Sequence, residues 1–183
     1  RLKSLSASGE NRMEAMRGLL RSQYQQKKWT EAVDNAQELL KEKNTSIDDK
    51  VLAFMVTARA DQDRGAYAAA ISNFKQVVGI NNASFGAEAR YEIASCYFSL
   101  NDLKNADRAA FETINKSGSY DFWITRAYIL LGEVYYKQKD YFNAKATLQS
   151  VVDNSRITDL KNEAAEKLKA VTEAEKTESK IAG

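Results

Sequence analysis

The chain contains 183 residues, 44% of them apolar, and its 27 basic and 25 acidic side chains leave a net charge of +2. It has no histidine, which removes the commonest general base and the usual zinc ligand. The charge is too small for a typical nucleic-acid-binding domain, and no run of about 18 apolar residues is present to span a membrane. The absence of proline favours helices throughout.

A repeated pattern of small residues organises the chain. Four alanines recur at intervals of 38, 36 and 38 residues, each three residues after a large side chain: Ala32, Ala70, Ala106 and Ala144. Each also follows by twelve residues a second anchor position: Leu20, Ala58, Ala94 and Gly132. A period of this length marks a stack of two-helix units, and small side chains let the two helices of a unit cross closely.

In chain order we predict four helical hairpins, at about residues 9–44, 47–82, 84–117 and 119–154. From each alanine, apolar residues follow at four, seven and eight positions, as in Ala70, Phe74, Val77 and Val78, which is one stripe of an α-helix. Only Thr113 interrupts these stripes.

A single helix is predicted after the hairpins, at about residues 157–176. Its stripe has no partner helix after it: Ile157, Leu160, Ala164, Leu168 and Val171. Such a helix covers the last exposed apolar surface of a repeat array. Residues 1–8 and 179–183 are expected to be frayed, and asparagines such as Asn44 and Asn82 are expected to end helices.

These features resemble the tetratricopeptide repeat (TPR). The resemblance is most complete in the fourth unit, at Tyr128, Leu131, Gly132, Tyr135, Tyr141, Ala144 and Leu148. The period exceeds the 34 residues typical of the family, and the usual proline at the end of each unit is absent. The resemblance implies an all-α, right-handed α-solenoid of four hairpins and a C-terminal capping helix, forming a single array over residues 9–178.

No constellation in the sequence predicts catalysis. Cys96 has no histidine to activate it, and acidic pairs such as Asp48 and Asp49 lie at polar helix ends, where they are ordinary. We therefore expect no catalytic residue, cofactor or metal ligand, and no enzyme unless a catalytic domain precedes Arg1. The resemblance instead implies a protein-binding scaffold.

In arrays that resemble this one, the first helix of each unit lines a concave groove. Aromatic and arginine side chains, which are frequent binding anchors, occupy several of the groove positions. We expect ten residues to bind a peptide or protein segment there: Arg17, Arg21, Tyr24, Met55, Arg59, Tyr91, Phe98, Arg126, Glu133 and Tyr136. For the aromatic residues the alternative is packing against an adjoining helix.

A second hypothesis is structural. The chain would then be the C-terminal segment of a longer repeat protein, or a self-associating module that forms a homo-oligomer. The turn from Tyr136 to Tyr141 is similar in style to TPR segments of bacterial cell-envelope proteins, so we expect the bacterial periplasm or cell envelope. We expect a protein or peptide partner, no nucleic acid and no direct insertion into a membrane.

Overall fold

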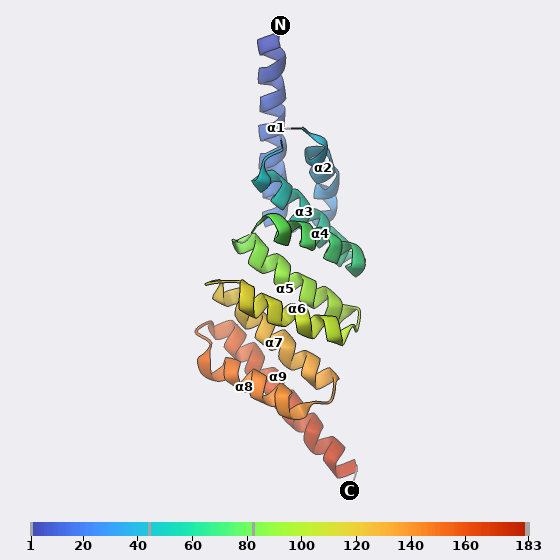
Figure 1. The fold of residues 1–183 in the computed structure, drawn as a ribbon, viewed down its shortest axis with the longest axis vertical. Coiled ribbons are helices and arrows are strands. Elements are labelled where there is room, and N and C mark those ends of the chain that lie inside the picture. Colours follow the sequence, from blue (N-terminus) through green and yellow to red (C-terminus); the bar gives the residue numbers. More distant parts are fainter. Residues whose placement is uncertain (1, 44, 82, 182–183) are drawn as a thin grey trace. The chain divides into compact units, whose positions relative to one another are not determined.

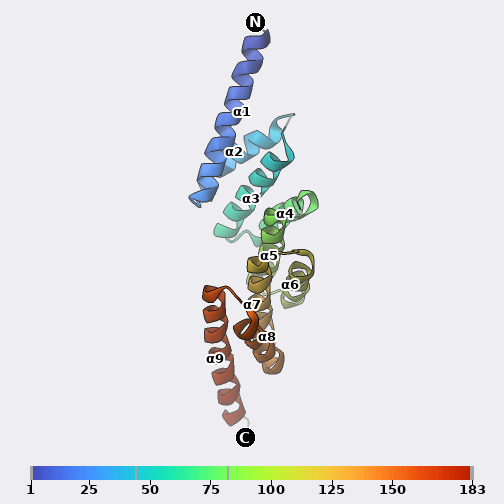
Figure 2. The same cartoon turned by 90° about the vertical axis from the view of Figure 1, so that its left-hand side faces the viewer.

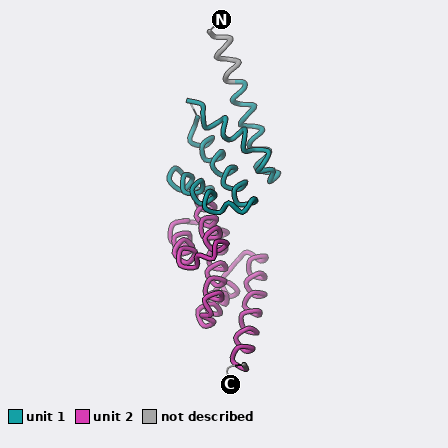
Figure 3. Tube along the Cα trace, turned by 90° about the vertical axis from the view of Figure 1, so that its right-hand side faces the viewer, with its two compact units in different colours: residues 1–85 teal, residues 86–183 magenta. Residues whose placement is uncertain are grey.

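The computed structural model describes the backbone of residues 2–43, 45–81 and 83–181, and the side chains of residues 11–43, 45–81 and 83–180. Every regular element in these ranges is an α-helix (Figure 1). The chain divides into two compact units, residues 1–85 and 86–183 (Figure 3). Asn44 and Asn82, the expected helix ends, lie outside the described residues. The single array over residues 9–178 stays a prediction.

The described helices form four hairpins and a closing helix, which confirms the all-α, TPR-like fold class. The hairpins are α1 (Leu2–Gln25) with α2 (Trp29–Lys41), α3 (Ile47–Asp63) with α4 (Tyr67–Ile80), α5 (Ser84–Ser99) with α6 (Leu103–Lys116), and α7 (Asp121–Lys137) with α8 (Tyr141–Asn154). The closing helix is α9 (Thr158–Ile181), and it lies along α7 and α8 (Figure 2).

One backbone geometry is repeated in all four hairpin turns. A residue with positive φ stands at the same place in each: Lys27 at 57°, Gly65 at 75°, Asn101 at 57° and Lys139 at 61°. The next N–H reaches five residues back, as when Asp140 donates to the Tyr135 carbonyl at 2.9 Å. This is the Schellman motif, which ends a helix by satisfying its last carbonyl groups and turning the chain sharply.

The second helix of each hairpin begins at the large residue that precedes the alanine. All four alanines are completely buried: Ala32, Ala70, Ala106 and Ala144. Thr113, the polar interruption of the apolar stripe, is also completely buried, and its hydroxyl donates to the Ala109 carbonyl at 2.9 Å. The interruption is therefore compatible with the core, because the hydroxyl is hydrogen-bonded within its own helix.

Each unit has its own apolar core. In the first unit the cluster joins α1, α2 and α3 through Met16, Leu20, Ala32, Ala36, Leu39, Leu52, Ala53 and Val56. In the second unit a cluster joins α7, α8 and α9 through Ile129, Ala144, Leu148, Val151, Leu160, Ala164 and Val171. The predicted stripe of the closing helix therefore faces the last hairpin.

A buried carboxylate fastens α1 to α3. Asp49 is 2% exposed and accepts a hydrogen bond from Arg17 Nε at 2.8 Å. Its N–H donates to the Ser46 hydroxyl at 3.1 Å, which caps α3. Burial opposes ionisation of Asp49, but the hydrogen bonds to Ser46 and Arg17 outweigh it and hold the pKa of Asp49 below its usual value.

We predict that Asp49→Asn lowers the free energy of unfolding by about 1 kcal/mol at neutral pH, because it removes a charged hydrogen bond. A depressed carboxylate pKa stabilises the fold above the unfolded value and loses this effect as the pH falls through the folded value. The difference from the natural chain should therefore shrink below about pH 4. Urea denaturation at several pH values measures it. Asp48→Asn, at an exposed neighbour in the same helical turn, is the control and should show no such change.

Gly132 on α7 lies close to Leu148 on α8. A Cβ added there would lie 2.7 Å from Cγ of Leu148, which is completely buried. We predict that Gly132→Ala lowers the free energy of unfolding by about 1–2 kcal/mol, since overpacking outweighs the gain in helix propensity. Gly18→Ala, where an added Cβ meets nothing within 4 Å, should instead be neutral or stabilising in the same urea titration. Equal effects of the two variants would contradict close packing at Gly132.

Candidate protein-binding surface

Arg126 on α7 links three helices of the second unit. Its Nη2 donates to the Tyr91 hydroxyl on α5 at 3.0 Å, and its Nη1 donates to Glu163 on α9 at 3.0 Å. Burial disfavours the charged guanidinium, but the neighbouring Tyr91 and Glu163 outweigh it and raise the pKa of Arg126. The sequence prediction named Arg126 and Tyr91, and the structure brings them together.

A second charged contact continues from Arg126 along the same helices. Lys167 on α9 donates to Glu133 on α7 at 2.7 Å, and its Nζ lies 3.9 Å from Glu163. Charges of opposite sign therefore alternate from Arg126 through Glu163 and Lys167 to Glu133. The sequence prediction included Glu133 but missed the two α9 residues, because α9 was interpreted only as a capping helix. The sequence did contain a sign of this contact: Glu163 and Lys167 are four residues apart, so they lie on the same face of a helix.

Tyr91 is a packing residue in this structure. It is 7% exposed, and its ring centroid lies 5.5 Å from that of Trp123. The Arg126 guanidinium carbon lies 5.2 Å from the Tyr91 ring centroid, a cation–π geometry. Burial raises the pKa of Tyr91 to about 12. The sequence prediction placed this ring on a solvent-facing groove wall. In the structure it is buried inside the second unit instead.

Two other predicted aromatics of the second unit stay accessible. Phe98 is half-buried, and Lys137 Nζ lies 4.2 Å from its ring centroid. Tyr136 is 38% exposed, with its ring centroid 6.0 Å from that of Tyr141. These residues lie at the C-terminal ends of α5 and α7, so the second unit presents aromatic surface and a cation there.

In the first unit the predicted residues are mostly engaged within the fold. Met55 is completely buried, which corrects its predicted place on an open groove wall. Tyr24 packs edge-to-face against Trp29, with ring centroids 4.9 Å apart. Arg17 pairs with Asp49, as described above, so its charge is neutralised between α1 and α3.

Two predicted arginines of the first unit differ in exposure. Arg59 is half-buried, donates to Gln62 at 3.2 Å and lies 5.9 Å from the Phe74 ring centroid. Arg21 on α1 is exposed. Binding by Arg21 and Arg59 stays a prediction, as it does for the other residues of the predicted set.

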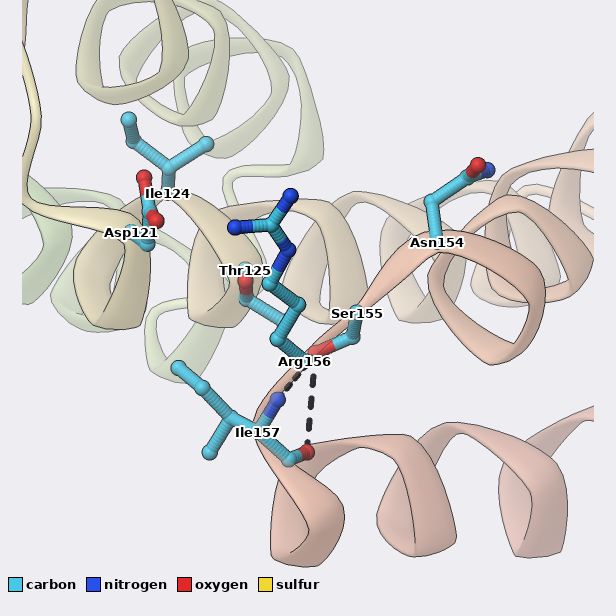
Figure 4. Close-up of a pocket in the computed structure, with 7 residues that line it drawn as sticks. All are labelled: Asp121, Ile124, Thr125, Asn154, Ser155, Arg156 and Ile157. Carbon is cyan, nitrogen blue, oxygen red and sulfur yellow. Dashed lines mark hydrogen bonds between the residues drawn. The ribbon is translucent and has the colours of Figure 1, made fainter.

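A shallow recess lies between the start of α7 and the connection from α8 to α9. It consists of two overlapping hollows of about 240 and 280 Å³, which share Ile124, Thr125, Asn154 and Ser155. Figure 4 shows the Arg156 side chain over this recess, beside a Ser155 hydroxyl that accepts from the Ile157 N–H at 3.2 Å. The lining contains none of the predicted binding residues.

The described residues show neither a membrane-spanning helix nor a cluster of metal ligands. Within these residues, no helix is both long and apolar enough to cross a membrane. Nor do the described side chains bring three or more histidine, cysteine, aspartate or glutamate residues together in a way that could hold a metal ion.

Two crystal structures share this fold. One is a crystal structure of MamA, with a TM-score of 0.57 and 20% identity over 87% of this chain and 95% of that chain. The other, a crystal structure of MamA protein, has a TM-score of 0.58 and 20% identity over 92% of this chain and 94% of that chain. No curated protein matches the sequence. At this level of identity the likeness concerns the fold alone.

Two family models, both described as tetratricopeptide repeat, match residues 56–121 and 126–155. Together they cover more than half of the chain, including the third and fourth hairpins, where the sequence resemblance is clearest. The predicted resemblance is therefore confirmed. Repeats of this family are generally non-catalytic modules that bind other proteins. The chain belongs to the tetratricopeptide-repeat family and is a protein-interaction scaffold.

Proposed function

We propose that the second unit binds a peptide or protein segment at a surface formed by the C-terminal ends of α5 and α7. We call this surface the aromatic end and define it by Phe98, Tyr136 and Lys137. The observation that carries the proposal is that folding leaves Tyr136 exposed and Phe98 half-buried beside Lys137, whereas Tyr91 is 7% exposed and packs against Trp123.

The chemistry of the aromatic end favours one kind of ligand. Aromatic rings offer large, rigid contact area at a low cost in side-chain entropy, which is why they are frequent anchors at interfaces. Lys137 is held over Phe98 and adds a positive charge beside the apolar surface. A segment with an apolar side chain next to an acidic one would complement both features.

The proposed ligand is a segment of another protein. The proposed role of the chain is to bind it without catalysis. Arg126 pairs with Glu163 and Glu133 pairs with Lys167, so their charges are already balanced by residues of α9 and attract a ligand less. Arg21 is a separate exposed cation on the first unit, and binding there stays a prediction.

We predict that the double variant Phe98→Ala and Tyr136→Ala weakens capture of the native partner by at least about tenfold, a loss of about 1.4 kcal/mol that is ordinary for two anchors. Affinity capture from the source cell with quantitative mass spectrometry identifies the proteins retained, and titration of the purified partner measures the loss. Phe111→Ala is the matched control, since Phe111 is 42% exposed but lies on α6.

The variant Tyr91→Ala shows how much stability is lost when a packed aromatic residue is removed, and so it is the reference for the double variant. It should lower the free energy of unfolding by about 3 kcal/mol, because it empties a buried aromatic site. The double variant at the aromatic end should melt within a few degrees of the natural chain. If the double variant unfolds as readily as Tyr91→Ala, then Phe98 and Tyr136 are packing residues and the proposal fails.

A second candidate function is structural. Phe142 is 77% exposed and lies on α8, the second helix of the fourth hairpin. Aromatic side chains are frequent anchors at interfaces, so Phe142 is the residue through which we expect contact with a further copy or a neighbouring repeat. In this alternative the chain is a structural or self-associating segment of a longer repeat protein. The proposed location is a bacterial cell-envelope assembly, because the turn from Tyr136 to Tyr141 is similar to turns of TPR segments in such proteins.

We predict, for this structural alternative, a dimer at micromolar concentration that Phe142→Ala dissociates. Sedimentation equilibrium of the two proteins measures this directly. Phe122→Ala provides the comparison, since Phe122 is also exposed but lies at the start of α7. If the chain stays monomeric at these concentrations, the self-associating alternative is wrong and the binding of another protein is the function that is left.

A further inference from the structure

The exposed side of α8 forms one stripe. Its members follow one another at intervals of four residues, are all exposed and carry no charge: Phe142, Ala146, Ser150 and Asn154. Residues with this spacing lie on one side of a helix. Phe142, at 77%, is the most exposed of the large apolar side chains that the structure describes. A large ring therefore stands at one end of an uncharged stripe.

The other end of this stripe borders the recess described above. Asn154 lines both hollows, and Ser150 lines the larger one. The apolar lining consists of half-buried Ile124 and Tyr128 and of buried Val151. The hollows of about 240 and 280 Å³ each exceed the roughly 150 Å³ in which a protein cavity holds a benzene ring. The recess therefore has room for a phenyl ring and offers it apolar contacts.

Phe142 cannot reach this recess in its own chain. The helix from Phe142 to Asn154 is about 18 Å long at 1.5 Å per residue. Because Phe142 and the recess lie at opposite ends of one helix, a second copy that lies antiparallel along α8 brings both together at once. Such a pairing has two-fold symmetry, in which each copy contributes its ring and receives the other's.

The charges at the two ends of α8 are complementary in this pairing. Asp140 comes two residues before Phe142, and Arg156 comes two residues after Asn154. A register that sets Phe142 opposite Asn154 therefore sets Asp140 opposite Arg156. Arg156 is exposed, and no described residue forms an ion pair with it. Hydrogen bonds from Asn143 hold the pKa of Asp140 below its usual value, so this carboxylate is charged at neutral pH.

The middle and the rim of the surface suit the same register. Ala146 lies opposite Ser150, so two small side chains meet near the two-fold axis and allow the helix axes to approach to about 8–10 Å. The recess is also lined by the acidic residue Asp121. The end of α8 that arrives there carries Lys139 beside Asp140, so charges of both signs meet charges of both signs.

We propose that α8 of one copy packs antiparallel against α8 of a second copy, with each Phe142 seated in the other copy's recess and each Asp140 beside the other copy's Arg156. This pairing rests on the self-associating alternative proposed above and identifies where Phe142 binds. The occupant of the recess is a second copy of this chain. The two equivalent contacts lie about 18 Å apart, so their contributions add.

The experiment compares two variants of the full chain with their mixture by sedimentation equilibrium, with one variant fluorescently labelled. Phe142→Ala removes the ring and keeps the recess, whereas Thr125→Arg fills the recess from α7 and keeps the ring. We predict that each variant alone dimerises about a hundredfold more weakly than the natural chain, since both contacts are lost at about tenfold each. Mixed dimers should be only about tenfold weaker, because one ring still meets one open recess.

Further variants act at exposed positions. Arg156→Glu should weaken the natural dimer by about tenfold, a factor of about three at each of two exposed pairs. Lys169→Glu makes the same change of charge at an exposed position of α9 and should leave the dimer unchanged. Thermal melting shows whether Thr125→Arg folds. If it does not, Asn154→Arg replaces it, because Asn154 is exposed and lines both hollows.

The outcomes separate this pairing from self-association in general. If Phe142→Ala dissociates the dimer but variants that fill the recess do not, Phe142 binds elsewhere, so the inference is wrong while self-association stands. The two-fold pairing is also wrong if the mixture dimerises no better than its components, or if the natural chain forms open-ended species beyond the dimer. A natural chain that stays monomeric contradicts self-association itself, and this inference with it.

Discussion

The helices of each hairpin can pack only where their side chains leave room. In the fourth hairpin this constraint is explicit: the α-carbon of Gly132 stands so close to Leu148 that even a methyl group would overlap it. The four completely buried alanines show the same requirement at the start of every second helix. Close crossing within a hairpin determines which side chains of its two helices meet.

The turns make the same geometry repeatable. A positive φ at Lys27, Gly65, Asn101 and Lys139 ends each first helix in the same way. The Schellman hydrogen bonds then set the start of the second helix at a fixed distance from the anchor. Only one of the four positions is glycine, so the hydrogen bonds and packing impose a conformation that lysine and asparagine adopt less readily.

Within the second unit, alignment of α5, α7 and α9 divides the aromatic and charged residues into two groups. Tyr91 and Arg126 lie where three helices meet, so their interactions are satisfied within the fold. Phe98 and Tyr136 lie at helix ends and keep accessible surface. The second unit thus has charged residues paired between its helices and, apart from them, the accessible aromatic end for which we propose binding.

The closing helix has a dual character for a physical reason. A repeat array needs a last helix to cover apolar surface, and the first part of α9 does so with buried side chains. Its second part has no buried side chain and contacts the last hairpin through the exposed Lys139–Glu178 pair and the half-buried Lys145–Glu175 pair.

The sequence by itself determined the fold class, the hairpin order and the anchor positions, because a repeating pattern of small and large residues reflects local packing that recurs in every unit. It also named Arg126, Tyr91 and Glu133 as binding residues, and their binding stays a prediction. Only the tertiary structure decided that Tyr91 and Met55 are buried whereas Tyr136 is exposed, because exposure depends on which neighbouring helix covers each position. The roles of Glu163 and Lys167 were decided there as well, since an ion pair between helices depends on the distance between side chains that are far apart in the sequence.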